Sequence, residues 1–494
     1  MVPYDLLYGL MLLLPIVGGA ICLALRSPRQ ILATMCATVA ASALICSWIV
    51  CRFFNNGPAE AAGGLVYVDA LSAYHLCVMM MVFVASSLYS WGYFLREASA
   101  GRINRRGLRQ FAGLWCGALA AMTLVLISNN LGIMWVGIEA TTLLTAFLIC
   151  IPVKPASLEA MWKYLLICSV GVAFAFLGTL MVAASASGLH VNPSDSLLWT
   201  KLRQSAALLH PMLLKTGFLF LLVGYGTKAG LAPMHSWLPD AHSQAPAPVS
   251  AIFSGFMLNA ALYCVLRYIP IVEITTGHVG WSHQLLVLFG LVSIIVAAAF
   301  IIFQHNVKRL LAYSSVEHIG IITLGFGLGG LGIFAALFHT LNHSICKTLA
   351  FFAAGRLGQT YGTHDMKKMS GSLRSAPVWG TGLFGGILVL IGVAPFAIFM
   401  SEFQLLKAAV DNRAILTLIL FLAGGSVVFV GALGHAIAMA WGKPSPAMEP
   451  ESAGILEKFL SFAPLAILLV LGLWMPAPLL NILKQAASVL GASR

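Results

Sequence analysis

Long apolar runs alternate with short polar connections along nearly the whole chain. A helix needs about 20 mostly apolar residues to cross a lipid bilayer. About fourteen windows meet this requirement, near residues 5–25, 31–54, 67–95, 111–128, 130–151, 160–186, 212–232, 247–268, 284–304, 309–329, 331–355, 377–411, 414–441 and 459–480. The pattern predicts an all-α polytopic membrane protein with about 14 transmembrane helices.

The same four-residue pattern, Gly-x-Ala-Pro, interrupts two of these windows. The seventh runs into Gly230-Leu-Ala-Pro233, and the twelfth contains Gly392-Val-Ala-Pro395. Proline breaks the helical hydrogen-bond ladder, and glycine lowers the cost of bending. Inside lipid, irregular backbone is tolerated only where protein or a watery cavity surrounds it. We therefore expect broken helices 7 and 12 and an internal repeat around a transport site, although Gly, Ala and Pro are common enough in membrane helices for coincidence.

Composition supports the membrane assignment. Of 494 residues, 60% are hydrophobic and 9% are charged, whereas soluble proteins carry about a quarter charged residues. The net charge of +12 comes from basic residues in short connections, where they set topology and do not indicate nucleic-acid binding. The ten cysteines are scattered singly without a Cys-x-x-Cys pair. Iron–sulfur and structural zinc sites are therefore not expected, and we predict no cofactor in this chain.

The third connection predicts the orientation of the chain. It holds five arginines between Arg96 and Arg109, and cytoplasmic loops of membrane proteins are enriched in basic residues. This connection should therefore face the cytoplasm. Counting helices outward from it places both termini outside.

Several ionisable residues lie inside the apolar windows. A charge at the centre of a bilayer costs about 2.5–3.5 kcal/mol on insertion scales, so each such residue is a functional candidate. Two of them flank the helix breaks, and three are spaced four residues apart on one helical face. These residues are Glu139, Lys228, His339, His343, Lys347 and Glu402.

Two acids and two amines at membrane depth suggest a charge-coupled relay. A carboxylate near a lysine favours the charged form of the lysine, and its withdrawal leaves desolvation to favour the neutral form. A modulated pair of Glu139 and Lys228 could thus take up a proton and pass it on. The alternative is a static buried salt bridge, which often costs more in desolvation than it returns.

Other assignments stay open at this stage. His339 and His343 could share a metal ion, but no third ligand of the right kind is evident, so no metal site is predicted. The same histidines could be packed polar groups instead of a relay. Glu317 and His318 are adjacent and point about 100° apart, so we expect one to belong to the relay while the other packs. Asp69 and His75 are weaker candidates.

One long motif resembles a known family. The stretch Lys228-Ala-Gly-Leu-Ala-Pro-Met-His-Ser-Trp-Leu-Pro-Asp-Ala-His-Ser-Gln-Ala-Pro246 is similar to the signature of antiporter-like membrane subunits. These subunits occur in respiratory complex I, in cation/proton antiporters and in energy-converting nickel–iron hydrogenases. Lys308-Arg-Leu-Leu-Ala-Tyr-Ser-Ser315, His343-x-x-x-Lys347 and Ser401-Glu402-Phe403 add to the resemblance.

The resemblance implies a fold and a set of roles. It implies two inverted five-helix repeats, at 111–268 and 282–441, between an N-terminal part at 1–110 and a C-terminal part at 442–494. Glu139 and Lys228 would be the coupled pair, and Glu402 would lie on the exit side. The proton pathway would comprise Glu139, Lys228, His235, His242, Asn259, Glu317, His318, His339, His343, Lys347 and Glu402, with His235 and His242 near the cytoplasmic half-channel.

The chain departs from the family pattern at one position. The family usually has a lysine four residues before Tyr263 and eight before Arg267, but this chain has Asn259 there. An amide orders water yet holds no transferable charge at ordinary pH. Together with Ser-Ser-Val-Glu-His-Ile-Gly320, this variant resembles the hydrogenase-4 component F branch.

The resemblance leads to a functional expectation. The chain would translocate protons as a subunit of a hydrogenase-type, complex-I-like assembly in a bacterial inner membrane. Redox chemistry would take place in nickel–iron hydrogenase-like and iron–sulfur partner subunits. Two rivals stay open: a subunit of a multi-subunit cation/proton antiporter, and a membrane scaffold whose relay is vestigial because of Asn259.

Overall fold

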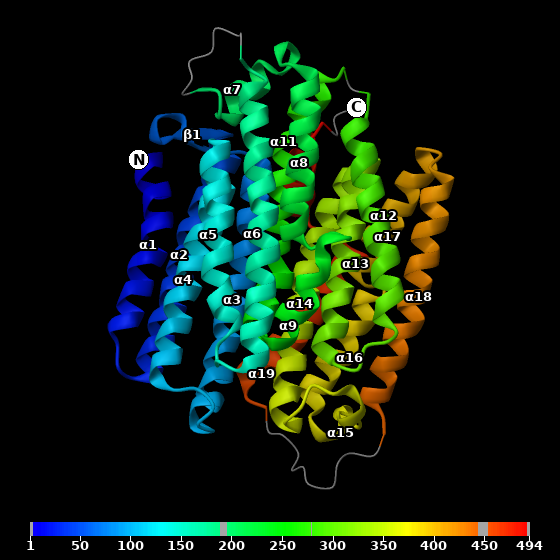
Figure 1. The fold of residues 1–494 in the computed structure, drawn as a ribbon. Helices are drawn as coiled ribbons and strands as arrows, with labels where there is room; N and C mark the ends of the chain where they lie inside the picture. The colour runs from blue at the N-terminus through cyan, green and yellow to red at the C-terminus, as the bar shows by residue number, and fades with distance from the viewer. Residues whose placement is uncertain (1–2, 188–194, 278, 443–452, 492–494) are drawn as a thin grey trace.

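The computed structural model describes residues 3–187, 195–277, 279–442 and 453–491. Long helices run side by side through the whole bundle, with short helices and a small hairpin at its ends (Figure 1). The elements are α1 (Tyr4–Ala24), α2 (Pro28–Asn56), β1 (Ala59–Ala61), β2 (Val66–Val68), α3 (Ala70–Ser99), α4 (Arg105–Ile127), α5 (Leu131–Ile149), α6 (Pro155–Ala184), α7 (Trp199–Gln204), α8 (Pro211–Ala229), α9 (Trp237–Gln244), α10 (Ala247–Ile252), α11 (Leu258–Thr275), α12 (Trp281–Ile301), α13 (Val307–Leu328), α14 (Leu331–Tyr361), α15 (Ser372–Ser375), α16 (Pro377–Leu390), α17 (Ala397–Asp411), α18 (Ile415–Ala440), α19 (Ile455–Leu473) and α20 (Ala477–Val489).

The polytopic all-α fold predicted from the apolar windows is confirmed. Within the described residues, 11 helices are long and apolar enough to cross a membrane, counting α10 and α11 as one. The remaining windows hold α8, α14 and the pair of α16 and α17. The number of 14 crossings stays a prediction. The division of the chain into segments 1–110, 111–268, 282–441 and 442–494 also stays a prediction.

Helix starts follow local capping chemistry. Asparagine and aspartate side chains accept hydrogen bonds from the free amides of a first helical turn. Asn104 caps α4, Asn130 caps α5 through Gly132 and Ile133, and Asn306 caps α13. α2, α6, α8 and α16 instead begin with a proline, which needs no amide partner at that position. These signals hold the ends of the apolar windows in place.

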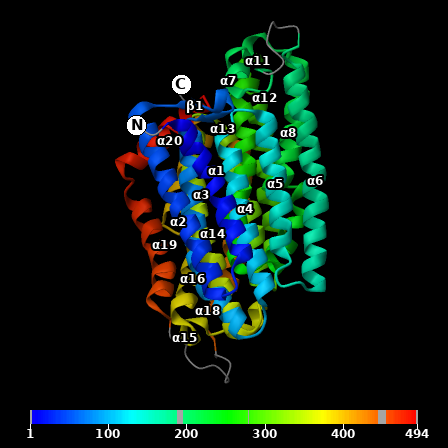
Figure 2. The same cartoon turned by 90° about the vertical axis from the view of Figure 1, so that its left-hand side faces the viewer.

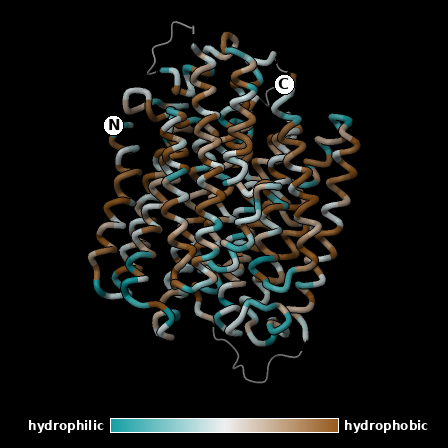
Figure 3. Tube along the Cα trace, viewed as in Figure 1, coloured by the Kyte–Doolittle hydropathy of each residue, from teal (hydrophilic) through white to brown (hydrophobic). Residues whose placement is uncertain are grey.

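The inner helices have no lipid-facing side. The most apolar stretches of the α10–α11 span and of α13 are 100% buried, whereas those of α18 and α19 are 28% buried. Figure 3 shows the outer helices mostly in hydrophobic colours, with polar positions at the ends and along the middle of the bundle. Polar side chains on the inner helices therefore lie among protein groups, away from acyl chains, which is where membrane proteins tolerate them.

Both predicted helix breaks are present. α8 ends at Ala229, and Gly230 adopts a left-handed backbone with φ 79° before the chain resumes as α9. α16 ends at Leu390, and Gly392 has φ 71° before α17 begins. In the first break, Ser293 Oγ accepts a hydrogen bond from the amide of Ala232 at 2.9 Å. Protein groups thus replace part of the missing helical ladder, as irregular backbone at membrane depth requires.

A third irregularity was not predicted from the sequence. Residues Phe253–Met257 form a π-helical turn, η5, between α10 and α11. Such a turn inserts an extra residue into a helix and is frequent at functional sites. Here it lies between α10 and the start of α11, two residues before Asn259.

A buried ion pair joins two distant segments near the end of the bundle that carries the hairpin. Arg267 on α11 donates to Asp69 through Nη1 at 2.6 Å and Nη2 at 2.9 Å, with side chains 4% and 3% exposed. The guanidinium also bonds Tyr263 and lies 4.8 Å from the ring centroid of Trp199. His75 makes a hydrogen bond within its own helix, to Leu71 O at 2.8 Å. In this structure Asp69 and His75 thus make structural contacts at the start of α3.

The two ends of the described chain lie at the same end of the bundle. Figures 1 and 2 both place the start of α1 and α20 at the end opposite the arginine-rich connection between α3 and α4. This arrangement agrees with an even number of crossings. The assignment of that end to the outside of a cell stays a prediction.

Candidate functional site

Titratable side chains from five helices lie deep within the bundle. Lys228 of α8, His318 of α13, and His339, His343 and Lys347 of α14 are each 0% exposed. Glu317 of α13 is 5% exposed, and Glu139 of α5 and Glu402 of α17 are partly buried. A row of ionisable groups at this depth is the arrangement found along ion and proton paths.

The first cluster surrounds Lys228. Its ammonium donates to Thr142 Oγ1 at 3.0 Å and to the hydroxyl of Tyr164. Glu139 accepts a hydrogen bond from Ser169 Oγ at 3.3 Å, and its other oxygen, Oε2, has no hydrogen-bond partner. No direct ion pair joins Glu139 and Lys228 in the described part of the chain.

The amine nevertheless contacts the helical face that carries the carboxylate. Thr142 lies three residues after Glu139 on α5, and residues at this spacing are neighbours on a helix surface. Thr142 Oγ1 itself donates to the carbonyl of Ile138 at 3.1 Å, so Lys228 approaches Glu139 without a hydrogen-bonded link to it in the described residues. The arrangement in this structure differs from the static salt bridge considered above, and it leaves Glu139 free to change its distance from Lys228.

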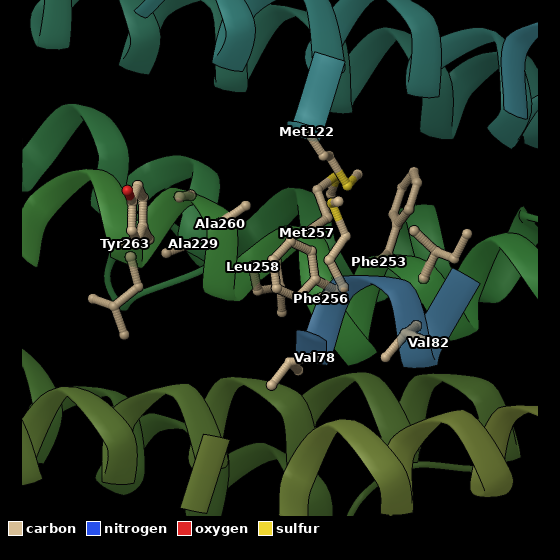
Figure 4. Packing of buried hydrophobic residues seen from close by; sticks show 14 of the residues in the cluster. Val78, Val82, Met122, Ala229, Phe253, Phe256, Met257, Leu258, Ala260 and Tyr263 are labelled. Carbon is tan, nitrogen blue, oxygen red and sulfur yellow. The ribbon is translucent and has the colours of Figure 1, made fainter. Parts of the chain in front are cut away.

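Apolar side chains of the π-helical turn lie next to the first cluster. The hydroxyl of Tyr164 lies 3.8 Å from Met257 Sδ, and its ring lies 5.8 Å from that of Phe253. Phe253, Phe256 and Met257 are at most 1% exposed. Figure 4 shows Met257 beside Phe253, Phe256 and Met122 among the buried hydrophobic side chains of this region. The π-helical turn thus contacts Tyr164 of the first cluster through Phe253 and Met257, and it reaches the second cluster through Ser254.

The second cluster is centred on Lys347. Its ammonium donates to the carbonyl of Leu311 at 2.8 Å, and Ser315 donates to the same carbonyl at 2.9 Å. Ser315 also shares a hydrogen bond of 2.7 Å with Ser254 in the π-helical turn. Within the described residues no carboxylate lies within ion-pair distance of Lys347. A buried lysine held only by neutral groups changes its protonation more readily than one held by an acid.

A histidine wire lies near Lys347, although no hydrogen bond joins the lysine to a histidine in the described residues. His318 Nδ1 lies 2.9 Å from His339 Nε2, and His339 Nδ1 lies 2.9 Å from Ser401 Oγ. The ring of His343 lies 5.1 Å from that of His318. Ser401 can donate either to His339 or to the carbonyl of Ile398. The same heavy-atom positions therefore accommodate two opposite orders of hydrogens along the wire, as a proton-conducting chain needs.

Beside the wire, two glutamates line a cavity. Glu317 and Glu402 line a cavity of about 440 Å³ between α12, α13, α17 and α18. Phe403 and Val430, which are 55% and 72% exposed, form its rim, so the cavity opens toward the outer surface of the bundle. Adjacent Glu317 and His318 face different surroundings: Glu317 lines this cavity, with no hydrogen-bond partner for its Oε2 in the described residues, whereas His318 belongs to the histidine wire.

The positions of these side chains also bear on whether the histidines could bind a metal ion. Donor atoms of His318, His339 and Glu402 lie within 4.8 Å of one another, so the structure brings a third ligand type to His339 that the sequence did not reveal. Both nitrogens of His339 already make hydrogen bonds, however, and the two facing imidazole nitrogens are 2.9 Å apart. Two Zn–N bonds of about 2.0–2.1 Å need a wider separation in tetrahedral geometry. The present arrangement therefore fits a hydrogen-bonded wire better than a metal site.

The remaining predicted residues lie close to these clusters. His242 is 0% exposed, neither ring nitrogen has a hydrogen-bond partner, and its ring stacks 4.9 Å from that of Phe351. Half-buried His235 lies at the break of α8, with its ring 6.2 Å from Tyr313. Asn259 donates to Gly255 O at 3.3 Å and to Ser344 Oγ at 3.4 Å. Through Ser344, Asn259 approaches the helix that carries Lys347.

Several hydroxyl groups of the site were not predicted. Thr142, Tyr164 and Ser169 hold the first cluster, and Ser401 continues the histidine wire. Hydroxyl residues are frequent in membrane helices, where they usually bond their own backbone, so their presence carries no signal. Only Ser401 carried a signal in the sequence, because it stands beside Glu402 in the Ser401-Glu402-Phe403 motif that resembles the family.

Gly392 offers a direct test of the position of Glu402. A Cβ atom added at Gly392 would lie 2.5 Å from Glu402 Oε2, and its φ of 71° already disfavours any other residue. We expect Gly392→Ala to displace the carboxylate and to destabilise the protein by about 1 kcal/mol or more. Gly434→Ala is the matched control, because no atom lies within 4 Å of its added Cβ. Equal transport activity and equal melting temperatures of both variants in vesicles would contradict this placement.

Comparison with known proteins decides the family. The family model described as "NADH:quinone oxidoreductase/Mrp antiporter, TM" matches residues 128–428, which include every titratable group from Glu139 to Glu402. The chain belongs to this family. A relative in Methylacidiphilum infernorum, "Hydrogenase-4 component F homolog", is 38% identical over 405 residues, covering 82% of this chain and 84% of the relative.

Solved structures of the family share the fold. A chain of the membrane-bound sulfane sulfur reductase, an archaeal respiratory membrane complex, matches with a TM-score of 0.87 and 24% identity over 98% of this chain and 97% of its own. A chain of the Mrp complex from Dietzia matches with a TM-score of 0.84 and 18% identity, over 99% of this chain and 98% of its own. The chain is thus a multi-pass membrane protein with the antiporter-like fold.

Proposed function

We propose that this antiporter-like chain translocates protons as a membrane subunit of a complex-I-like, hydrogenase-type redox complex. One observation carries the proposal: a row of ionisable groups, from Glu139 through Lys228, Lys347 and the histidines to Glu402, crosses a bundle built mainly of apolar side chains. Burial of so many ionisable groups is costly and needs a function. The 38% identical relative, named a hydrogenase-4 component F homolog, supports the choice of complex.

The geometry suggests how a proton moves. Glu139 changes the stability of the charged form of Lys228 according to its distance, and the ammonium of Lys228 is held only by hydroxyl groups. In the second cluster Lys347 exchanges a proton with the nearby histidines. The wire of His318 and His339 then reverses its hydrogen order and delivers the proton toward Glu402.

The apolar side chains of the π-helical turn make the central step conditional. Met257 and Phe253 interrupt the polar contacts beyond Tyr164, so a proton crosses only when water enters beside them. A lysine at the position of Asn259 would supply a titratable group near this gap, whereas the amide of Asn259 only orders water. We infer that entry of water here, driven by the charge states of Lys228 and Lys347, couples the two clusters.

The row ends at two different sides of the bundle. Glu139 and Ser169 lie between α5 and α6, and the cavity of Glu402 opens beside α17 and α18 on the other side of Figure 1. We propose that neighbouring membrane subunits cover these ends and that nickel–iron hydrogenase-like and iron–sulfur subunits of a peripheral arm perform the redox chemistry. The complex would lie in a bacterial inner membrane, with both termini of this chain outside.

Alanine substitutions in the first cluster test transport. In vesicles that contain the assembled complex, we expect Lys228→Ala and Glu139→Ala to lower the number of protons moved per electron, because each removes one partner of the charge switch. Lys215→Ala is the control, since Lys215 lies on the same helix but packs 5.7 Å from the ring of Trp281. Unchanged stoichiometry in both test variants, with the complex intact, would favour a non-transporting scaffold.

A cation/proton antiporter subunit is the second candidate. The match to the Mrp complex over 99% of the chain favours it, because the fold is shared along its whole length. Vesicles without any redox substrate discriminate the two functions. A sodium gradient that drives proton movement through the wild-type chain would support the antiporter and contradict the redox-coupled proposal.

A further inference from the structure

An apolar groove lies on the outer surface of the bundle, away from the relay. It has a volume of about 470 Å³ and lies against α4, with α1 on one side and α5 on the other. Leu23, Phe147 and Val153 form its exposed walls and are 52%, 57% and 70% exposed. The residues that line it are Leu23, Gln110, Gly113, Leu114, Leu144, Phe147, Cys150, Ile151 and Val153.

The groove exists because α1 packs closely on α4. A Cβ atom added at Gly113 would lie 3.1 Å from the side chain of Leu23, and one added at Gly19 would lie 3.2 Å from Cys116 Cβ. Small residues let the two helices approach, while the flank of α5 stays uncovered. In a bilayer an acyl chain fills such a groove, because water there would have no polar partners.

Basic residues stand close in the sequence to residues that line the groove at its end toward the arginine-rich connection, although none of them is a lining residue. Arg106 precedes Gln110 by one helical turn, Arg26 follows Leu23 by three residues, and Lys154, which lines an adjacent pocket, follows Val153 directly. All three are exposed, and none makes an ion pair within the described residues. A nearby acid, Glu159, is already paired with Lys163 at 2.6 Å.

We propose that this groove binds one anionic phospholipid, with an acyl chain between α1 and α5 and its phosphate held by Arg106, Arg26 and Lys154. Basic residues near a membrane surface attract anionic headgroups, and a cleft between helices holds the tail in place. Topology alone explains basic residues in this connection. It does not explain why exposed cations without an ion pair in the described residues stand beside the lining residues of an apolar groove.

Native mass spectrometry of the full chain in detergent tests the proposal, with phosphatidylglycerol and phosphatidylcholine added separately. We expect wild type to bind phosphatidylglycerol more tightly than phosphatidylcholine. Arg106→Gln with Lys154→Gln should weaken phosphatidylglycerol binding by roughly fivefold for each cation removed. Leu144→Trp, which fills the groove and keeps every cation, should weaken the binding of both lipids.

Matched substitutions decide the outcome. Lys367→Gln with Lys368→Gln removes two exposed cations that do not border the groove, so lipid preference should be retained. The proposal is overturned if this control loses as much preference as the groove variant, because the effect is then one of net charge. It is also overturned if Leu144→Trp binds both lipids like wild type, or if wild type shows no preference.

Discussion

Replacing Lys347 with methionine is expected to lower proton translocation at least about a hundredfold while leaving the protein as stable as before or more stable. Positioned acid–base groups typically contribute 10²–10⁴-fold to the rate of a proton transfer, a range that sets this estimate. The stability result follows from burial. Lys347 is 0% exposed, and among the described residues its ammonium bonds the carbonyl of Leu311 and no carboxylate, so its charged form carries a desolvation penalty that no acid there offsets.

Transport and melting temperature of the same purified complex check this expectation. Methionine has a similar length and no charge, and replacing buried charges with apolar side chains is often neutral or stabilising by about 1–4 kcal/mol. Lys367→Met, at an exposed site, is the control for loss of a positive charge. Wild-type transport by Lys347→Met would remove the second cluster from the pathway. A large loss of stability would instead assign the lysine a structural role.

Asp69→Asn is expected to destabilise the chain by about 3–5 kcal/mol, because it leaves Arg267 buried without its counter-charge. The two side chains are 4% and 3% exposed and make two hydrogen bonds with each other. Asparagine keeps the shape of aspartate and one acceptor oxygen but removes the charge. This ion pair ties the start of α3 to α11, so its loss should also loosen the contact with Trp199.

Equilibrium unfolding in detergent with a chemical denaturant measures this effect. Asp411→Asn is a matched control, since its partner Lys407 is 60% exposed and Asp411 is 51% exposed. Exposed pairs of this kind contribute about 0–1 kcal/mol. Equal unfolding free energies of the two variants would show that Arg267 finds other partners and that the ion pair does not hold α3 on α11.

Sequence reasoning was most successful where the physical cause is local. Whether an apolar window crosses a membrane depends on its own length and composition, and the helices occupy these windows. Gly230 and Gly392 marked both helix breaks correctly, because glycine and proline act on the backbone where they stand. The motif after Lys228 predicted the family, which the match over residues 128–428 confirms.

Sequence reasoning was less successful for contacts between helices. Nothing in the chain indicated that Lys228 would bond Thr142 and Tyr164 in place of Glu139. Neither the π-helical turn nor the apolar packing of Met257 was predicted, although together they interrupt the row of charges. A uniformly apolar helix has no polar face from which its rotation can be read, so neighbouring helices decide which side chains meet.

The sequence by itself determined that this is a polytopic helical protein of the antiporter-like family, with two broken helices and ionisable residues at membrane depth. Hydropathy and backbone chemistry act within a single segment, and they need no partner to be read. Only the tertiary structure decided that His318 meets His339, that Ser401 extends their wire, and that Glu317 shares a cavity with Glu402. Those contacts join residues on three different helices, and their distances depend on how each helix is rotated and shifted against the others.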